Sequence, residues 1–94
     1  MKYVLRLYVT GHTSTSRRAI ENIQRICEER LKDNYDLQVI DILKNPRLAE
    51  NEKIIVTPTL VRKLPAPLRK IIGDLSQTEK VLLGLDIVEM PERP

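Results

Sequence analysis

The chain has 94 residues, of which 41% are hydrophobic and 31% are charged, and its formal net charge is +3. These values are typical of one globular domain and exclude a disordered chain. No apolar run approaches the roughly 20 residues of a membrane span, and the N-terminus has no secretory pattern. We therefore expect one domain, residues 1–94, that is cytoplasmic and has no membrane partner.

A strand is predicted first, over residues 3–9, "YVLRLYV". Apolar residues alternate along it, so Leu5, Leu7 and Val9 share one face. We expect this face to point into the core.

A helix and a second strand follow. Thr15 or Ser16 is expected to cap the helix, whose apolar residues recur at three- and four-residue steps to about residue 33. Residues 36–43, "DLQVIDIL", indicate a second strand, which is parallel to the first because a helical crossover connects them. A short helix is predicted over residues 46–52, since a proline suits its first turn.

The segment 54–74, "IIVTPTLVRKLPAPLRKIIGD", supports two incompatible interpretations. In the extended one, residues 59–62 and 68–72 form a hairpin after a turn at Thr57. In the helical one, Thr57 caps a helix with Pro58 at its first position, and a second helix follows. Periodicity alone leaves both open.

The C-terminal segment also supports two interpretations. "SQTE", residues 76–79, is a capping box for a helix over residues 80–83. Either Gly84 ends this helix and a last strand runs over residues 85–90, or the helix continues to residue 87 or 88.

The sequence contains no recognisable catalytic motif. Cys27 is the only cysteine, and its helical spacing indicates a buried hydrophobic role. His12 is the only histidine, and we expect a solvated loop side chain. "VTPTLV" is typical of the proline turn of a thioredoxin-like fold, but the loop "GHTSTS", at the position of the redox motif, has no cysteine. We expect a binding protein without cofactor or metal, and the scattered tyrosines disfavour a nucleic-acid partner.

Three segments resemble the KaiB family of circadian-clock proteins, in order and with its spacing: "LYVTGHTSTSRRAI", "VIDILKNPRLAENEKIIVTPTLVRKLPAPLRKIIGDLS" and "EKVLLGLD". The resemblance covers residues 3–88. It implies an α/β domain with a constant, thioredoxin-like half over residues 1–50 and a metamorphic half over residues 51–94. The implied ground state is β-α-β-β-α-α-β in a dimer or tetramer, and the implied switched state is β-α-β-α-β-β-α in a monomer.

The resemblance also implies a function without enzymatic activity. A KaiB protein modulates the ATPase and phosphorylation cycle of KaiC, whose N-terminal ring binds the switched monomer. The assembly then captures KaiA or engages a clock histidine kinase. The alternative hypothesis is an adaptor of the same fold, for stress response or signalling, in a bacterium without the full oscillator.

The family's binding residues are transferred position by position. The implied contacts with KaiC are made by Arg18, Pro46, Leu48, Ala49, Glu50 and Lys53. The implied edge for KaiA lies at Leu37 and Gln38. Gln38 and Lys70 stand where cyanobacterial members usually have lysine and arginine, and the sequence ends at "MPERP" without their acidic tail. These departures favour a system without KaiA.

The residues expected to control the switch are Pro58, Pro65, Pro67, Gly84 and Asp86. Isomerisation of X–Pro bonds takes tens to hundreds of seconds, so the prolines are expected to slow interconversion. Gly84 weakens a helix by roughly 1 kcal/mol relative to alanine, and Asp86 places a negative charge near a helix C-terminus. Both residues are expected to favour the ground state over a long terminal helix.

Overall fold

The secondary structure follows the order β-α-β-α-β-β-α. The computed structural model describes residues 2–87 of the chain. Its elements are β1 (Tyr3–Val9), α1 (Ser14–Ile26), a π-helical turn η1 (Cys27–Leu31), β2 (Tyr35–Asp41), α2 (Pro46–Asn51), β3 (Thr59–Leu64), β4 (Arg69–Ile72) and α3 (Thr78–Gly84). This is the order that the resemblance assigns to the switched state.

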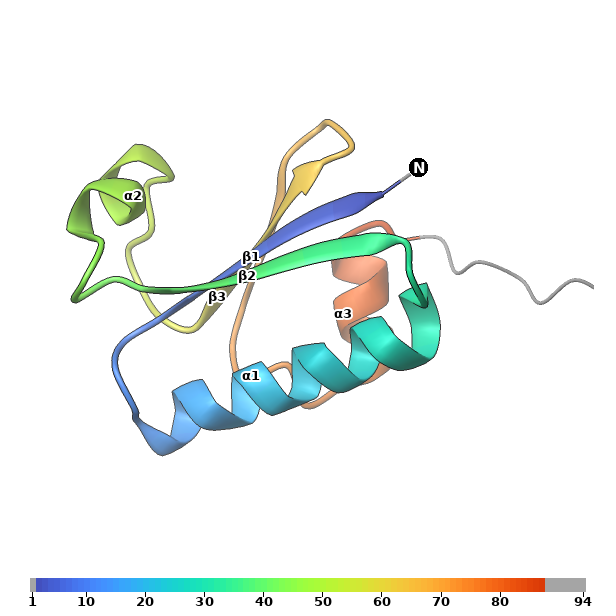
Figure 1. The fold of residues 1–94 in the computed structure, drawn as a ribbon, viewed down its shortest axis with the longest axis horizontal. Coiled ribbons are helices and arrows are strands. Elements are labelled where there is room, and N and C mark those ends of the chain that lie inside the picture. The colour runs from blue at the N-terminus through green and yellow to red at the C-terminus, as the bar shows by residue number, and fades with distance from the viewer. Residues whose placement is uncertain (1, 88–94) are drawn as a thin grey trace, which may run out of the picture.

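Within residues 2–87, four strands form one mixed sheet in the order β2-β1-β3-β4. β1 runs parallel to β2, as the helical crossover predicts, and β3 is antiparallel to both β1 and β4. α1 and α3 cover one face of the sheet, and α2 lies on the other side near its end (Figure 1). The outer edges of the sheet are therefore β2 and β4.

The main core lies between the sheet and the two helices α1 and α3. Leu5, Leu7 and Val9 are buried in it, which confirms the predicted inward face of β1. A smaller cluster on the opposite face contains Tyr8 and Val61, which are both fully buried. Because both faces of β1 are covered, the strand is apolar at more positions than a simple alternation would give.

The start of α1 differs from its prediction. The cap is Thr13, two residues before the nearer predicted one, and its hydroxyl oxygen accepts a 3.1 Å hydrogen bond from the Ser16 backbone N–H. Ser16 is buried inside the helix, where its hydroxyl oxygen accepts from the Thr10 N–H at 3.3 Å. In a run of four hydroxyl residues, the contact with Thr10 decides which one caps.

The second half adopts the extended interpretation. β3 and β4 form the predicted hairpin, with Thr59 opposite Ile72 and Arg62 opposite Arg69. Thr57 caps no helix; its hydroxyl forms a 2.6 Å hydrogen bond with that of Thr10. The helical interpretation of this segment is therefore wrong for this structure.

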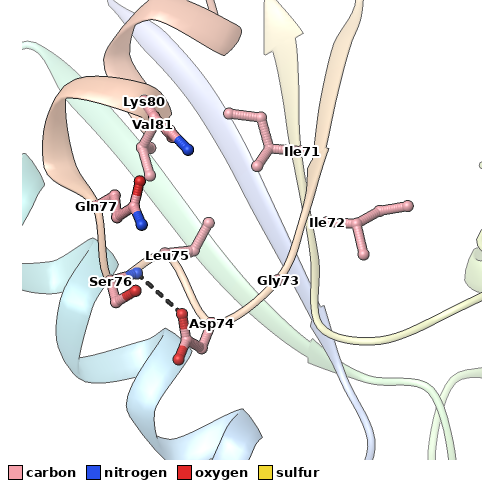
Figure 2. A pocket seen from close by; sticks show the side chains of 9 residues that line it. All are labelled: Ile71, Ile72, Gly73, Asp74, Leu75, Ser76, Gln77, Lys80 and Val81. Carbon is pink, nitrogen blue, oxygen red and sulfur yellow. Dashed lines mark hydrogen bonds between the residues drawn. The ribbon is translucent and has the colours of Figure 1, made fainter.

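The last helix confirms one prediction and corrects another. α3 ends at Gly84, but residues 85–87 form no strand, and residues 88–90 of the expected strand lie outside the described part. The predicted capping box does not form, since Gln77 precedes the helix without a side-chain cap. The Ser76 N–H, which the box would pair with Glu79, donates to Asp74 Oδ1 at 3.1 Å (Figure 2), and Glu79 pairs with Arg30 at 2.7 Å.

Candidate functional site

The candidate site is the surface of α2, which the sequence predicted as a short helix. Pro46 occupies its first turn, where a missing backbone N–H costs nothing. Asn45 precedes it, and its side-chain amide donates to the Asp41 carbonyl oxygen at 3.2 Å. The Asp41 carboxylate accepts from the N–H groups of Gly11 and Leu43, and these bonds lower the pKa of Asp41 from its ordinary value. The loop before α2 is thus held at both ends.

α2 presents a mixed apolar and charged surface to solvent. Pro46, Glu50 and Lys53 are exposed, and Leu48 is 37% exposed. Ala49 is buried, so of the transferred α2 residues its side chain alone points inward. Leu43, just before the helix, is 68% exposed, which sequence reasoning did not single out. We call the exposed set Leu43, Pro46, Leu48, Glu50 and Lys53 the α2 surface.

The end of α2 follows a defined helix-terminating pattern. Lys53 has a positive φ of 57°. Its N–H donates to the Glu50 carbonyl, and the Ile54 N–H donates back to the Ala49 carbonyl at 2.9 Å. These two bonds form a Schellman motif, which satisfies carbonyl groups that the helix end would otherwise leave free.

Glu52 joins α2 to the sheet. Its carboxylate side chain is only 10% exposed and pairs with Lys63 of β3 and, at 3.6 Å, with Arg6 of β1. Its carbonyl oxygen accepts from the Lys70 ammonium of β4. Sequence reasoning missed this residue, because its partners lie far away in the chain and become neighbours only once β1, β3 and β4 are side by side.

Arg18 lies against the loop that precedes α3. Its guanidinium is 3.6 Å from the carboxylate of Asp74. The backbone carbonyl of Asp74 also accepts a hydrogen bond from the side-chain amide of Asn22 at 2.8 Å. Hydrogen bonds from the Ser76 hydroxyl and N–H, and then the Arg18 charge, lower the pKa of Asp74. Asp74 and Ser76 line an open pocket of about 260 Å³ between this loop, β4 and α3 (Figure 2). This ion pair links Arg18 to the loop before α3 rather than to the α2 surface.

Leu37 and Gln38, the residues of the expected KaiA edge, lie on β2. This strand is the outer one beside β1, where Leu37 lies opposite Leu5 and Gln38 opposite Arg6. Leu37 is half-buried against the core, whereas Gln38 is exposed. The outer hydrogen-bonding groups of β2 have no partner strand among residues 2–87.

The five residues expected to control the switch all lie at ends or turns. The peptide bonds that precede Pro58, Pro65 and Pro67 are cis. Gly84 is the last residue of α3, and Asp86 has a positive φ of 53°.

Asp86 occupies a second Schellman motif. The Asp86 N–H donates to the Leu83 carbonyl at 3.0 Å, and the Ile87 N–H donates to the Leu82 carbonyl at 2.9 Å. These two bonds end α3 as the equivalent pair ends α2.

The residues weighed for catalysis are placed apart from one another. Cys27 is buried as predicted, and burial, helped by the nearby Glu28 charge, raises its thiol pKa to about 12. A neutral thiol is a poor nucleophile. His12 is exposed in the loop before α1.

Across residues 2–87 there is no cluster of three or more metal-binding side chains. No described helix is long and apolar enough to cross a membrane.

Comparisons with known proteins point to one family. The KaiB domain matches residues 6–87. The circadian clock protein KaiB3 of Synechocystis sp. is 61% identical over 93% of this chain and 85% of its own length. The circadian clock oscillator protein KaiB of Microcystis aeruginosa is 57% identical over 97% of this chain and 89% of its own length.

Solved structures support the fold. The N-terminal domain of Synechococcus elongatus SasA has a TM-score of 0.74 and 23% identity, covering 98% of this chain and 90% of that domain. Mitochondrial thioredoxin 3 of Saccharomyces cerevisiae has a TM-score of 0.75 and 14% identity, covering 93% of this chain and 79% of thioredoxin. The fold is therefore thioredoxin-like.

Proposed function

This chain belongs to the KaiB family of circadian-clock proteins, and we propose that it is a non-enzymatic clock protein that binds KaiC in the thioredoxin-like arrangement. The bound form is a monomer on the N-terminal ATPase ring, and binding modulates the ATPase and phosphorylation cycle. The observation that carries this proposal is the α2 surface, which combines exposed leucines with an acid and a base.

The composition of the α2 surface suits a protein partner. Leu43 and Leu48 expose aliphatic area beside Glu50 and Lys53, so a partner gains from apolar burial and from charge complementarity in one place. The Glu52 pairs hold α2 on the sheet, so this surface is preorganised and loses little freedom on binding.

We propose that residues 51–94 also adopt the ground arrangement of the family, β-α-β-β-α-α-β, in a dimer or tetramer. The two interpretations of residues 54–74 support this, because the same segment suits helices and strands. KaiC then selects the arrangement described above, and its apparent affinity falls with the fraction of chains in that arrangement. Pro58, Pro65, Pro67, Gly84 and Asp86 are our proposed controls of this equilibrium.

A second partner, KaiA or a clock histidine kinase, is proposed for the outer edge of β2 at Leu37 and Gln38. Unpaired N–H and C=O groups on an edge strand pair readily with an added strand. Gln38 offers hydrogen bonds but no charge, so an acidic partner gains less here than it would from a lysine.

The test is native mass spectrometry of the chain with its cognate KaiC hexamer, first with ATP and then with ADP, over several hours. We expect a complex that grows slowly, depends on the nucleotide and carries up to six copies per hexamer. Leu48→Glu should abolish it, whereas Leu83→Glu, which alters an exposed leucine of α3, should not. Absence of a complex with either nucleotide would contradict the proposal and favour the adaptor hypothesis.

A further inference from the structure

The outer edge of β4 is the second open edge of the sheet. β4 pairs with β3 on its inner side, and among residues 2–87 no strand pairs with its outer side. Its hydrogen-bonding groups on that side are therefore available to an added strand. This edge lies at the opposite end of the strand order from β2.

The exposed charged side chains of β4 are basic, and the Lys70 ammonium donates to the backbone carbonyl of Glu52 rather than to its carboxylate. Residues 60–72 include four basic residues and no acidic one. Arg62 is buried, where its guanidinium donates to the carbonyl oxygens of Pro67 and Asp86, and Lys63 pairs with Glu52. Arg69 and Lys70 are exposed, and no described carboxylate pairs with either side chain.

An apolar groove adjoins the same edge. It has a volume of about 320 Å³ and is lined by Lys53, Ile54, Ile55, Val56, Thr59, Lys70 and Ile72. Ile55 is 92% exposed and Ile72 is 67% exposed. On β4, Ile71 points toward α3 and Ile72 points away from it, so Ile72 and Lys70 lie on the groove side (Figure 2).

We propose that an extended segment of a partner protein adds to the outer edge of β4 and contributes two aliphatic residues followed by two acidic ones. Neighbours across a ladder share a face, so an antiparallel segment would set aliphatic residues opposite Ile72 and Ile71 and acids opposite Lys70 and Arg69. The first aliphatic side chain lies over the groove, and the acids neutralise the two cations. This interaction is separate from KaiC binding, for which the α2 surface is proposed.

A second copy of the chain fits this edge poorly. Parallel pairing of two β4 strands would set Arg69 and Lys70 opposite like cations, and antiparallel pairing centred on the strand would set each cation opposite an isoleucine. In neither case does a carboxylate of β4 face the cations. Basic residues on an edge strand disfavour self-association in this way. The same charges attract an acidic segment.

The experiment uses short labelled peptides and the full chain. The probe is acetyl-Thr-Val-Val-Glu-Glu-Thr-amide, and its controls are the lysine analogue acetyl-Thr-Val-Val-Lys-Lys-Thr-amide and the reversed order acetyl-Thr-Glu-Glu-Val-Val-Thr-amide. Fluorescence anisotropy measures affinity, and NMR amide shifts locate the contact. We expect the acidic probe to bind at least about tenfold more tightly than the lysine analogue and to shift the amides of residues 69–72.

Variants separate this edge from general charge attraction. Arg69→Glu should lower affinity for the acidic probe by about tenfold or more, while Arg17→Glu, an exposed change on α1, should leave it within about twofold. Ile72→Ser should also weaken binding, without a change in net charge. The proposal is overturned if both charge variants bind equally, if the shifts map to β2, or if the acidic probe shows no saturable binding at millimolar concentration.

Discussion

The carboxylate of Glu52 pairs with the ammonium of Lys63, which connects the C-terminal end of α2 to the C-terminal part of β3. Arg6 of β1 approaches the same carboxylate at 3.6 Å. Two cations beside one nearly buried carboxylate make this a network, and networks contribute more than isolated surface pairs. The α2 surface therefore depends on a residue that points away from it.

Glu52→Gln should destabilise this arrangement by about 1–2 kcal/mol, because it leaves two partly buried cations without their acid while it keeps the shape of the side chain. Urea unfolding measures the loss. Glu50→Gln is the control, since Glu50 is exposed on the same helix, and it should change stability by less than about 0.5 kcal/mol. Equal effects of the two variants would contradict the role of the network.

The gain in helix stability from Gly84→Ala should be limited by a close contact with Ile71. An added Cβ at Gly84 would lie 2.7 Å from the Ile71 Cδ1 atom, which must move to admit it. Ile71→Val removes that atom at a cost of roughly 0.5–1.5 kcal/mol. Valine keeps the Cγ1 atom, which lies 3.1 Å from the added Cβ, so alanine in the double variant should realise part of its helix preference of up to about 1 kcal/mol over glycine.

The measurement for this pair is a double-mutant cycle on urea unfolding, together with NMR populations of the thioredoxin-like form. We expect the double variant to be more stable than the sum of the single effects by about 0.5 kcal/mol or more. Additive effects would mean that Ile71 moves aside at no cost and that the close approach does not limit the substitution.

Asp86→Asn should raise the population of the thioredoxin-like form. Asp86 follows the C-terminus of α3 with a φ of 53°, a conformation that asparagine also tolerates. The change removes a negative charge from the negative end of the helix dipole, a gain of typically about 0.3–1 kcal/mol. NMR populations and oligomer size report the result.

Asp86→Val is the contrasting variant. It removes the same charge but places a β-branched residue at positive φ, which is strongly disfavoured. We expect it to lower the thioredoxin-like population. If valine and asparagine raise it equally, charge alone matters.

Local patterns in the sequence predicted the parts of the fold that depend on local chemistry. The alternation of Leu5, Leu7 and Val9 predicts the inward face of β1, and Pro46 predicts the start of α2. Both predictions are correct because each pattern acts within its own element. The cap of α1 was misplaced because Thr13, Thr15 and Ser16 are chemically equivalent until Thr10 packs against one of them. The hairpin could not be chosen over two helices, since that choice depends on pairing with β1.

In the candidate site, too, the sequence predicted local features and missed those that depend on contacts between distant residues. The exposed residues of α2 were available from the family motif, but the inward side chain of Ala49 and the pairing of Arg18 with Asp74 were not. Glu52 gave no local signal, because a Glu at a helix end is ordinary until Arg6 and Lys63 are known to face it.

Cys27 should resist alkylation in the native protein. Burial raises its thiol pKa to about 12 from 9.0, so the thiol stays protonated and covered at neutral pH. Iodoacetamide labelling followed by mass spectrometry should give no product until urea unfolds the chain. Rapid labelling without denaturant would contradict this burial.

The raised pKa of Cys27 also predicts how the stability of the fold changes at alkaline pH. The unfolded thiol ionises near pH 9, whereas the folded thiol stays neutral until about pH 12, so the unfolded state binds fewer protons between these values. Stability that is present below about pH 9 is therefore lost progressively as the pH rises toward 12. Urea unfolding of Cys27→Ala should show a smaller alkaline loss than the parent chain, although the variant is less stable at neutral pH. If the two chains lose stability in parallel above pH 9, the thiol is not the group responsible.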